Sequence, residues 1–151
     1  MGSLFSNPES KIIIVGLDNA GKTTLINRIN PDSFDDEEVS ATVGVQEECF
    51  TKNKIKFTVY DMSGQSKYRD LWQQFYDQSE AIIFVIDSAD TFRMQIAKNE
   101  LQELLQNKGL IERDVPILFY ANKQDMLGAQ SAAEISNILD LHDITDRSWK
   151  I

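Results

Sequence analysis

The sequence has little of several residue types, and each shortage limits what the protein can be. It holds one cysteine, Cys49, and one histidine, His142. A lone cysteine cannot form an internal disulfide, which fits a reducing compartment, and we expect Cys49 to pack on a strand as a small hydrophobic residue. His142 has no partner at a spacing typical of a catalytic triad or a metal site, so we expect it to lie at the surface or cap a helix.

Basic residues and long apolar runs are also scarce. The chain has 15 Lys and Arg against 24 Asp and Glu, a net charge of −9. Binding to a phosphate backbone requires a basic face, so we expect no nucleic-acid partner. No apolar run approaches the length that spans a membrane. With 151 residues, 42% of them hydrophobic, the composition predicts a single monomeric domain with a substantial core.

One stretch, Gly16 to Thr23, fills every fixed position of the phosphate-binding pattern G-x-x-x-x-G-K-(S/T). It follows an apolar run and precedes a helical pattern, which is the context that this motif requires. Glycines let backbone N–H groups turn toward phosphate oxygens, and the helix adds its positive end. Lys22 can reach the outer phosphates, and the Thr23 hydroxyl can ligate Mg²⁺. The predicted nucleotide-binding residues here are Asp18, Asn19, Ala20, Gly21, Lys22, Thr23 and Thr24.

A second motif, Asn122-Lys123-Gln124-Asp125, indicates the base. It follows the apolar run 116–121, at the carboxyl end of a predicted strand, where open α/β sheets bind ligands. The Asp125 carboxylate can accept hydrogen bonds from N1–H and the N2 amino group of guanine, a donor pair that adenine lacks. We expect Asn122 to tie this loop to the phosphate loop and the stem of Lys123 to cover the base. The motif therefore predicts GTP and GDP as ligands.

A third segment lies between these motifs. The alternating run 55–60 predicts a strand that leads into Asp61, which we expect to support Mg²⁺ from its second coordination shell. Gly64 can bring its N–H close to the γ-phosphate, and Gln65 is placed to orient the attacking water as the one catalytic residue. Thr42, in a polar segment upstream, is the predicted second hydroxyl on Mg²⁺ beside Thr23.

Strand and helix patterns alternate along the chain. Apolar or alternating runs predict strands at 11–15, 45–51, 55–60, 81–86, 116–121 and 149–151. Helical spacing predicts helices at 22–29 and 92–105, with Gly109 after the end of the second, and a capping box opens another at Ser131. Parallel crossovers and one hairpin give an α/β fold, the three-layer P-loop NTPase sandwich with a mostly parallel six-stranded sheet and one antiparallel pair.

Together these motifs resemble those of small GTPases of the ADP-ribosylation-factor-like family, in the Ras superfamily. The resemblance covers residues 11–151 and rests on G-L-D-N-A-G-K-T-T, T-V-G, D-x-S-G-Q, Y-R-D-L-W and N-K-Q-D. The phrases F-T-V-Y-D-M-S-G-Q-S-K-Y-R-D-L-W and A-I-I-F-V-I-D-S-A-D are most similar to the ciliary branch of the family, which is tied to the Bardet–Biedl coat complex. Met62-Ser63 supports this branch, because relatives usually carry a second glycine there.

The resemblance implies a GTP-dependent switch that recruits a coat or adaptor effector to membranes in vesicular or ciliary trafficking. An exchange factor and a GTPase-activating protein would control it. Hydrolysis should be slow, because Asp18 places a carboxylate near the leaving phosphates and no arginine in the chain is an obvious finger in cis. The resemblance also implies an apolar effector patch made of Val45, Tyr60, Trp72 and Phe75.

Residues 1–10 carry a predicted membrane signal. M-G-S-L-F-S matches the N-myristoylation pattern, with Gly2 as the acylated residue. One acyl chain gives only reversible membrane binding, and Pro8 interrupts the segment after Leu4 and Phe5, so a second anchor is weak or absent. We expect a cytoplasmic protein that associates reversibly with membranes, at the cilium or basal body if it belongs to the ciliary branch.

The C-terminus departs from the family pattern. Family members continue beyond Ile151 with a loop that contacts the guanine base and a helix that covers the sheet, so we expect a fold in which that helix is missing. Two alternatives to the switch stay open at this point. One is an interaction module that has lost nucleotide affinity. The other is a P-loop ATPase or kinase, against which Asn122 and Asp125 argue.

Overall fold

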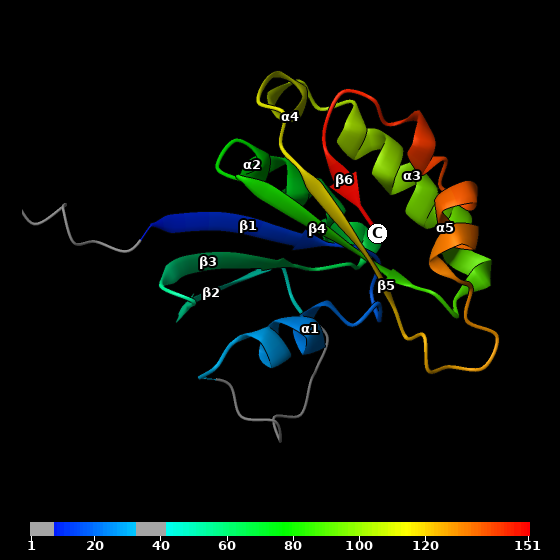
Figure 1. Ribbon diagram of the computed structural model, residues 1–151, viewed down its shortest axis with the longest axis horizontal. Coiled ribbons are helices and arrows are strands. Elements are labelled where there is room, and N and C mark those ends of the chain that lie inside the picture. The colour runs from blue at the N-terminus through cyan, green and yellow to red at the C-terminus, as the bar shows by residue number, and fades with distance from the viewer. Residues whose placement is uncertain (1–7, 33–41) are drawn as a thin grey trace, which may run out of the picture.

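Six strands form one sheet in the order β2-β3-β1-β4-β5-β6 in the computed structural model, which describes residues 8–32 and 42–151 (Figure 1). β2 and β3 pair antiparallel, and every other neighbouring pair is parallel. This confirms the predicted mixed sheet. The strands are β1 (Glu9–Val15), β2 (Val45–Lys52), β3 (Ile55–Met62), β4 (Ala81–Asp87), β5 (Ile117–Asn122) and β6 (Trp149–Lys150).

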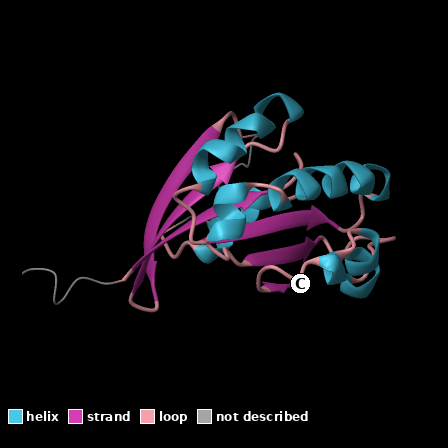
Figure 2. Cartoon of the chain, turned by 90° about the horizontal axis from the view of Figure 1, so that it is seen from above, coloured by secondary structure: helices cyan, strands magenta, loops and turns pink. Residues whose placement is uncertain are grey.

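Helices pack on both faces of the sheet, as the turned view shows (Figure 2). The α-helices are α1 (Lys22–Ile29), α2 (Trp72–Tyr76), α3 (Met94–Leu105), α4 (Lys108–Glu112) and α5 (Ala132–Ile138), and 3₁₀ turns occupy Ser66–Leu71, Thr91–Arg93 and Leu141–Asp143. The predicted capping box at the start of α5 is present, because the Ser131 hydroxyl accepts from Glu134 N–H while the Glu134 carboxylate accepts from Ser131 N–H.

Alternation along β1 divides the core into two clusters. Ile13 and Val15 belong to the larger cluster, which includes residues of α2, α3 and α5. Ile14 belongs to the smaller cluster, with Ile26 of α1. Because successive strand side chains point to opposite faces, the apolar residues of β1 contribute to the core on both sides of the sheet. This central position fixes the loop that follows β1 between α1 and the carboxyl ends of β3 and β4.

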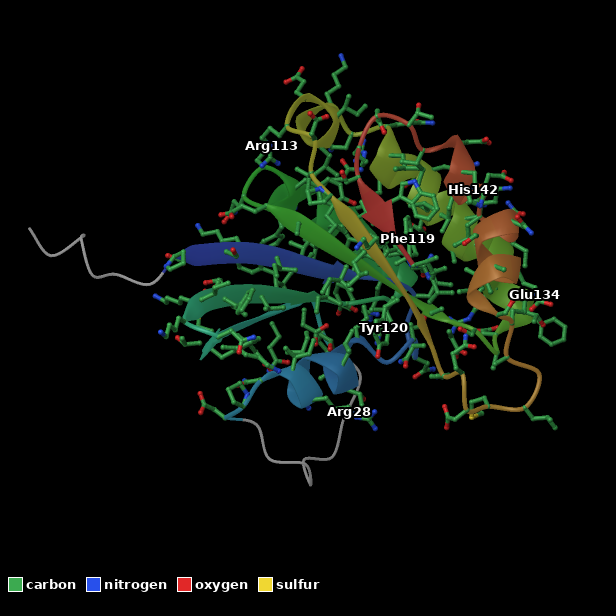
Figure 3. The ribbon with its side chains drawn as sticks, in the orientation of Figure 1. Arg28, Arg113, Phe119, Tyr120, Glu134 and His142 are labelled. Atoms are coloured by element: carbon green, nitrogen blue, oxygen red, sulfur yellow. The ribbon has the colours of Figure 1, made fainter. Side chains whose placement is uncertain are left out.

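β5 is not buried on both faces, although it lies in the apolar run 116–121. Ile117 and Phe119 are buried, at 2% and 1% exposure, whereas Leu118 and Tyr120 are 42% and 40% exposed (Figure 3). The pattern is an alternating one, because only the face toward α3 and α5 is covered among the described residues. The larger cluster therefore takes every second residue of β5.

Three local predictions need correction. α3 begins at Met94 rather than at residue 92, and Phe92, in the preceding 3₁₀ turn, is fully exposed. Gly109 lies inside the unpredicted short helix α4 rather than after a helix end. Cys49 is exposed on the edge strand β2 instead of packed. In the described part of the chain, no helix has both the length and the apolar content needed to cross a membrane.

Candidate nucleotide-binding site

A cleft of about 370 Å³ lies where β1, β3 and β5 end. Its walls combine segments that are far apart in the sequence: the loop before α1, the residue at 42, the segment after β3 and the loop after β5. Every lining residue except Ser63 is a predicted site residue, with Gln65 predicted as catalytic and the others as nucleotide-binding. The lining consists of Asp18, Asn19, Gly21, Lys22, Thr23, Thr24, Thr42, Ser63, Gly64, Gln65 and Lys123.

The loop from Gly16 to Gly21 owes its shape to close backbone approach. Gly16 has φ +146°, and a Cβ there would lie 2.3 Å from the Val85 carbonyl oxygen. Gly21 has φ +95°, and a Cβ there would lie 2.3 Å from the Asn122 amide nitrogen. α1 starts at the next residue with no side-chain cap among the described residues. Its first backbone N–H groups thus remain available for phosphate oxygens at the positive helix end.

Lys22 lies under this loop, only 6% exposed. Its ammonium donates to the carbonyl oxygens of Gly16 at 3.0 Å and Leu17 at 2.8 Å. Burial lowers the pKa of Lys22 to about 8, and the nearby carboxylates of Asp61 and Asp18 oppose that shift. An anion in the cleft would favour the charged ammonium. A bound phosphate would therefore raise the pKa of Lys22 and stabilise its charged form.

Asp61 and the two predicted hydroxyls meet at the floor of the cleft. Thr23 Oγ1 donates to Asp61 Oδ2 at 2.5 Å, and Thr42 Oγ1 lies 3.0 Å from Thr23 Oγ1 and 3.4 Å from the same carboxylate. Asp61 is 1% exposed, and its Oδ1 has no hydrogen-bond partner among the described residues. Burial raises the pKa of Asp61, opposed by the hydroxyl donors and Lys22. This set of hard oxygen atoms around an unpartnered carboxylate oxygen fits Mg²⁺.

Gly64 rests directly on the phosphate loop. A Cβ at this position would lie 2.3 Å from the Asp18 nitrogen, 2.3 Å from the Leu17 carbonyl carbon and 2.5 Å from Lys22 Nζ. Gln65 follows at the cleft wall. Only a residue without a side chain allows the chain to pass this close. The structure thus places the predicted γ-phosphate contact, Gly64, beside Lys22 and the predicted catalytic residue, Gln65, at the cleft wall.

The loop after β5 is tied to the phosphate loop, as the motif predicted. Asn122 Nδ2 donates to the Ala20 carbonyl oxygen at 2.9 Å. Lys123 Nζ donates to the Asn19 carbonyl oxygen at 2.5 Å and to the Asp87 carboxylate at 2.8 Å. Asp87 ends β4 and was not predicted, although an acid directly after a buried apolar run marks a strand end at this sheet edge. Asp125 is exposed.

Two arginines contact the phosphate loop, and the sequence did not predict these contacts. Arg93 donates to the Asp18 carboxylate at 2.7 Å and to the Asp18 carbonyl oxygen at 2.8 Å, and it also pairs with Asp90 at 2.6 Å. Arg69 Nη2 lies 3.9 Å from the same Asp18 carboxylate. No arginine of the described residues lines the cleft. These contacts join positions up to 75 residues apart, and no local pattern in the sequence signals them.

The predicted effector patch is only partly at the surface. Tyr60 and Trp72 are buried, at 7% and 2% exposure, while Val45 and Phe75 are half-buried. The Tyr60 and Phe75 rings pack against each other at a tilt of 46°, with centroids 5.0 Å apart. In this conformation the accessible part of the patch is therefore made by Val45 and Phe75. The predicted acylation site, Gly2, lies outside the described residues.

Comparison with known proteins agrees with this geometry. The model of the ADP-ribosylation factor family matches residues 1–151. ADP-ribosylation factor-like protein 6 of Danio rerio is 45% identical over 143 residues, covering 95% of this chain and 77% of the relative, and the Caenorhabditis elegans protein of that name is 36% identical over 153 residues, covering 100% of this chain and 80% of the relative.

Among solved structures, the Arl6 BBS3 small GTPase from Trypanosoma brucei, with bound nucleotide analogue GppNp, superposes with a TM-score of 0.88 at 42% identity. The match covers 95% of this chain and 84% of that chain. The family match, these relatives and the cleft lead to one conclusion. The chain belongs to the ADP-ribosylation factor family, whose small GTPases bind and hydrolyse GTP.

Proposed function

We propose that this GTPase recruits a coat or adaptor effector to membranes, in vesicular or ciliary trafficking, when GTP is bound. The observation that carries the proposal is the cleft, in which Thr42 contacts Thr23 at the end of the phosphate-binding motif and Gly64 lies against the loop itself. These two residues flank the hairpin of β2 and β3. A nucleotide that holds or releases them therefore acts on both ends of one hairpin.

The hairpin connects the nucleotide to the surface. Val45 pairs with Met62 at the end of the β2–β3 ladder nearest the cleft, and Ser63 N–H donates to the Gly44 carbonyl oxygen at 2.8 Å. Loss of the γ-phosphate would release Thr42 and Gly64, in the manner of order–disorder switches. The accessible patch at Val45 and Phe75 would then change with the nucleotide. An effector that reads this apolar surface would distinguish GTP from GDP.

Mg²⁺ belongs to this proposal as the metal cofactor. Thr23 and Thr42 would hold it through their hydroxyls, and Asp61 would support it from the second shell. When bound, Mg²⁺ neutralises charge on the phosphate oxygens. The buried Asp61 carboxylate keeps both hydroxyls aimed at one point. Chelation of Mg²⁺ should weaken nucleotide binding, as a titration with and without EDTA would measure.

Slow hydrolysis is part of the proposed switch. Gln65 is placed to orient water, whereas Arg69 and Arg93 are engaged by protein acceptors and line no part of the cleft. An activating protein would have to supply the missing positive charge. We expect single-turnover hydrolysis below about one per minute without that protein. A substantially faster rate for the purified chain would contradict this expectation.

Membrane association would come from myristate on Gly2, which gives reversible attachment. The sequence pattern M-G-S-L-F-S supports it. The similarity to ADP-ribosylation factor-like protein 6 supports a place at the cilium or basal body. Mass spectrometry of the native protein tests the acylation, and an unmodified Gly2 would remove this part of the proposal.

The switch itself is tested by titrating the purified chain with fluorescent GDP and a fluorescent GTP analogue. The titration is run with and without Mg²⁺, and with ATP as competitor. Tight, Mg²⁺-dependent binding that ATP does not displace would support the proposal. Absence of binding would favour an interaction module that has lost nucleotide affinity. Displacement by ATP would favour an ATPase or kinase.

A further inference from the structure

Two side chains hold the carbonyl groups on either side of Gly64. The indole Nε1 of Trp72 donates to the Ser63 carbonyl oxygen at 3.0 Å, and Arg69 Nε donates to the Gly64 carbonyl oxygen at 3.0 Å. Trp72 is 2% exposed, and the Arg69 side chain is 13% exposed. Both donors come from the turn and helix that follow Gln65. Neither side chain lines the cleft.

Because the peptide group is planar, these hydrogen bonds fix the direction in which the neighbouring N–H groups point. In a planar trans peptide, the C=O and the N–H point opposite ways. The Ser63 carbonyl shares its peptide group with the Gly64 N–H, so the bond from Trp72 fixes where that N–H points. The bond from Arg69 fixes the next peptide group in the same way, which sets the start of Gln65. Gly64 itself lies against Lys22 at the cleft.

Arg69 is in turn anchored to two other parts of the molecule. Its Nη1 donates to the Glu100 carboxylate on α3 at 3.1 Å, and its Nη2 lies 3.9 Å from the Asp18 carboxylate on the phosphate loop. The guanidinium presents its donors in a rigid planar fork, so these contacts hold the Nε that reaches Gly64. α3 lies in the well-packed larger core cluster, which makes it a firm base.

We propose that Arg69, assisted by Trp72, is a positioning residue that aims the Gly64 N–H and Gln65 at the γ-phosphate position. Arg69 does not line the cleft and acts through the backbone that it holds. Only a triphosphate can accept a hydrogen bond from the Gly64 N–H at the γ-phosphate position. Arg69 therefore increases the affinity for GTP relative to GDP. The inference rests on the proposed function, because it requires guanine nucleotide in the cleft.

The test compares affinities of the full chain for a non-hydrolysable GTP analogue and for GDP. Arg69→Ala should lower the analogue-to-GDP affinity ratio about tenfold, which corresponds to about 1.4 kcal/mol. Trp72→Phe keeps an aromatic side chain and loses the indole N–H, so it should also lower the ratio. Arg113→Ala is the matched control, because Arg113, like Arg69, donates to backbone carbonyl groups. Its acceptors are the carbonyl oxygens of Gly109, Ser79 and Tyr76, away from the cleft.

The control separates positioning from a loss of stability. Arg113→Ala should leave the affinity ratio unchanged, whatever its effect on thermal unfolding. Equal losses of analogue and GDP affinity in Arg69→Ala would overturn the inference while leaving the GTPase switch intact. If that variant folds poorly, an unchanged ratio in Trp72→Phe overturns it instead. A wild-type chain that binds no guanine nucleotide overturns the proposed function and this inference together.

Discussion

Gly64→Ala adds the smallest possible side chain at the point where the segment after β3 touches the phosphate loop. The new Cβ would lie 2.3 Å from the Asp18 nitrogen and 2.3 Å from the Leu17 carbonyl carbon. Both are backbone atoms that cannot rotate away. The third neighbour, Lys22 Nζ at 2.5 Å, is itself held by two carbonyl oxygens. The segment must therefore move off the loop.

The cost of this movement should fall on the GTP-bound form alone. Overpacking a close contact costs about 1–3 kcal/mol, and opening the cleft avoids that cost while giving up the Gly64 contact with the γ-phosphate. We therefore expect affinity for a GTP analogue to fall by about five- to a hundredfold. GDP offers no γ-phosphate, so its affinity should stay within about twofold of wild type.

Equilibrium titration with both nucleotides measures this difference, and thermal unfolding checks that the variant folds. Gly109→Ala is the matched control. A Cβ on that glycine in α4 would come within 2.7 Å only of the Asp77 carboxylate, the movable end of a side chain. We expect wild-type affinities there. A Gly64→Ala protein that retains the wild-type ratio of analogue to GDP affinity would refute the close contact.

Three further variants test other contacts. Asn122→Ala removes the donor to the Ala20 carbonyl oxygen, so GTP and GDP should both dissociate about tenfold faster in stopped-flow experiments, and a change for one nucleotide alone would contradict this. Asp125→Asn should weaken guanine nucleotides about ten- to a hundredfold and improve xanthine nucleotides, with unchanged base preference in a competition assay as the contrary result. Ser131→Ala breaks the capping box with Glu134 and should lower the free energy of unfolding by about 1 kcal/mol without affecting nucleotide affinity.

Local sequence patterns were sufficient for the phosphate loop and its surroundings. The observed α1 has the predicted bounds, Lys22–Ile29, because the glycine-rich loop before it and Asn30-Pro31 after it restrict the backbone residue by residue. The hairpin was also predicted, and its turn places Asn53 and Lys54 at positive φ. Such features depend on neighbours within a few positions, so the sequence by itself can specify them.

The partners of these local elements were decided by tertiary structure. The sequence offered no arginine as an obvious finger in cis, and no arginine of the described residues lines the cleft. Arg93, from the 3₁₀ turn before α3, and Arg69, from the turn after Gln65, instead both approach the Asp18 carboxylate. Trp72 was predicted as an effector contact, and packing buries it here with its indole N–H on the Ser63 carbonyl oxygen. Periodicity shows that such residues lie on a helix face but not which loop that face meets.

Short-range features of the chain specify the ligand class and the order of the elements, since glycine conformation, strand alternation and helix capping act over short distances. Long-range packing sets which side chains meet around the cleft. The Arg69–Glu100 and Arg93–Asp18 pairs join positions 31 and 75 apart. Whether the members of such a pair meet depends on how parallel crossovers bring strand ends to one sheet edge. It also depends on how α3 packs in the larger core cluster.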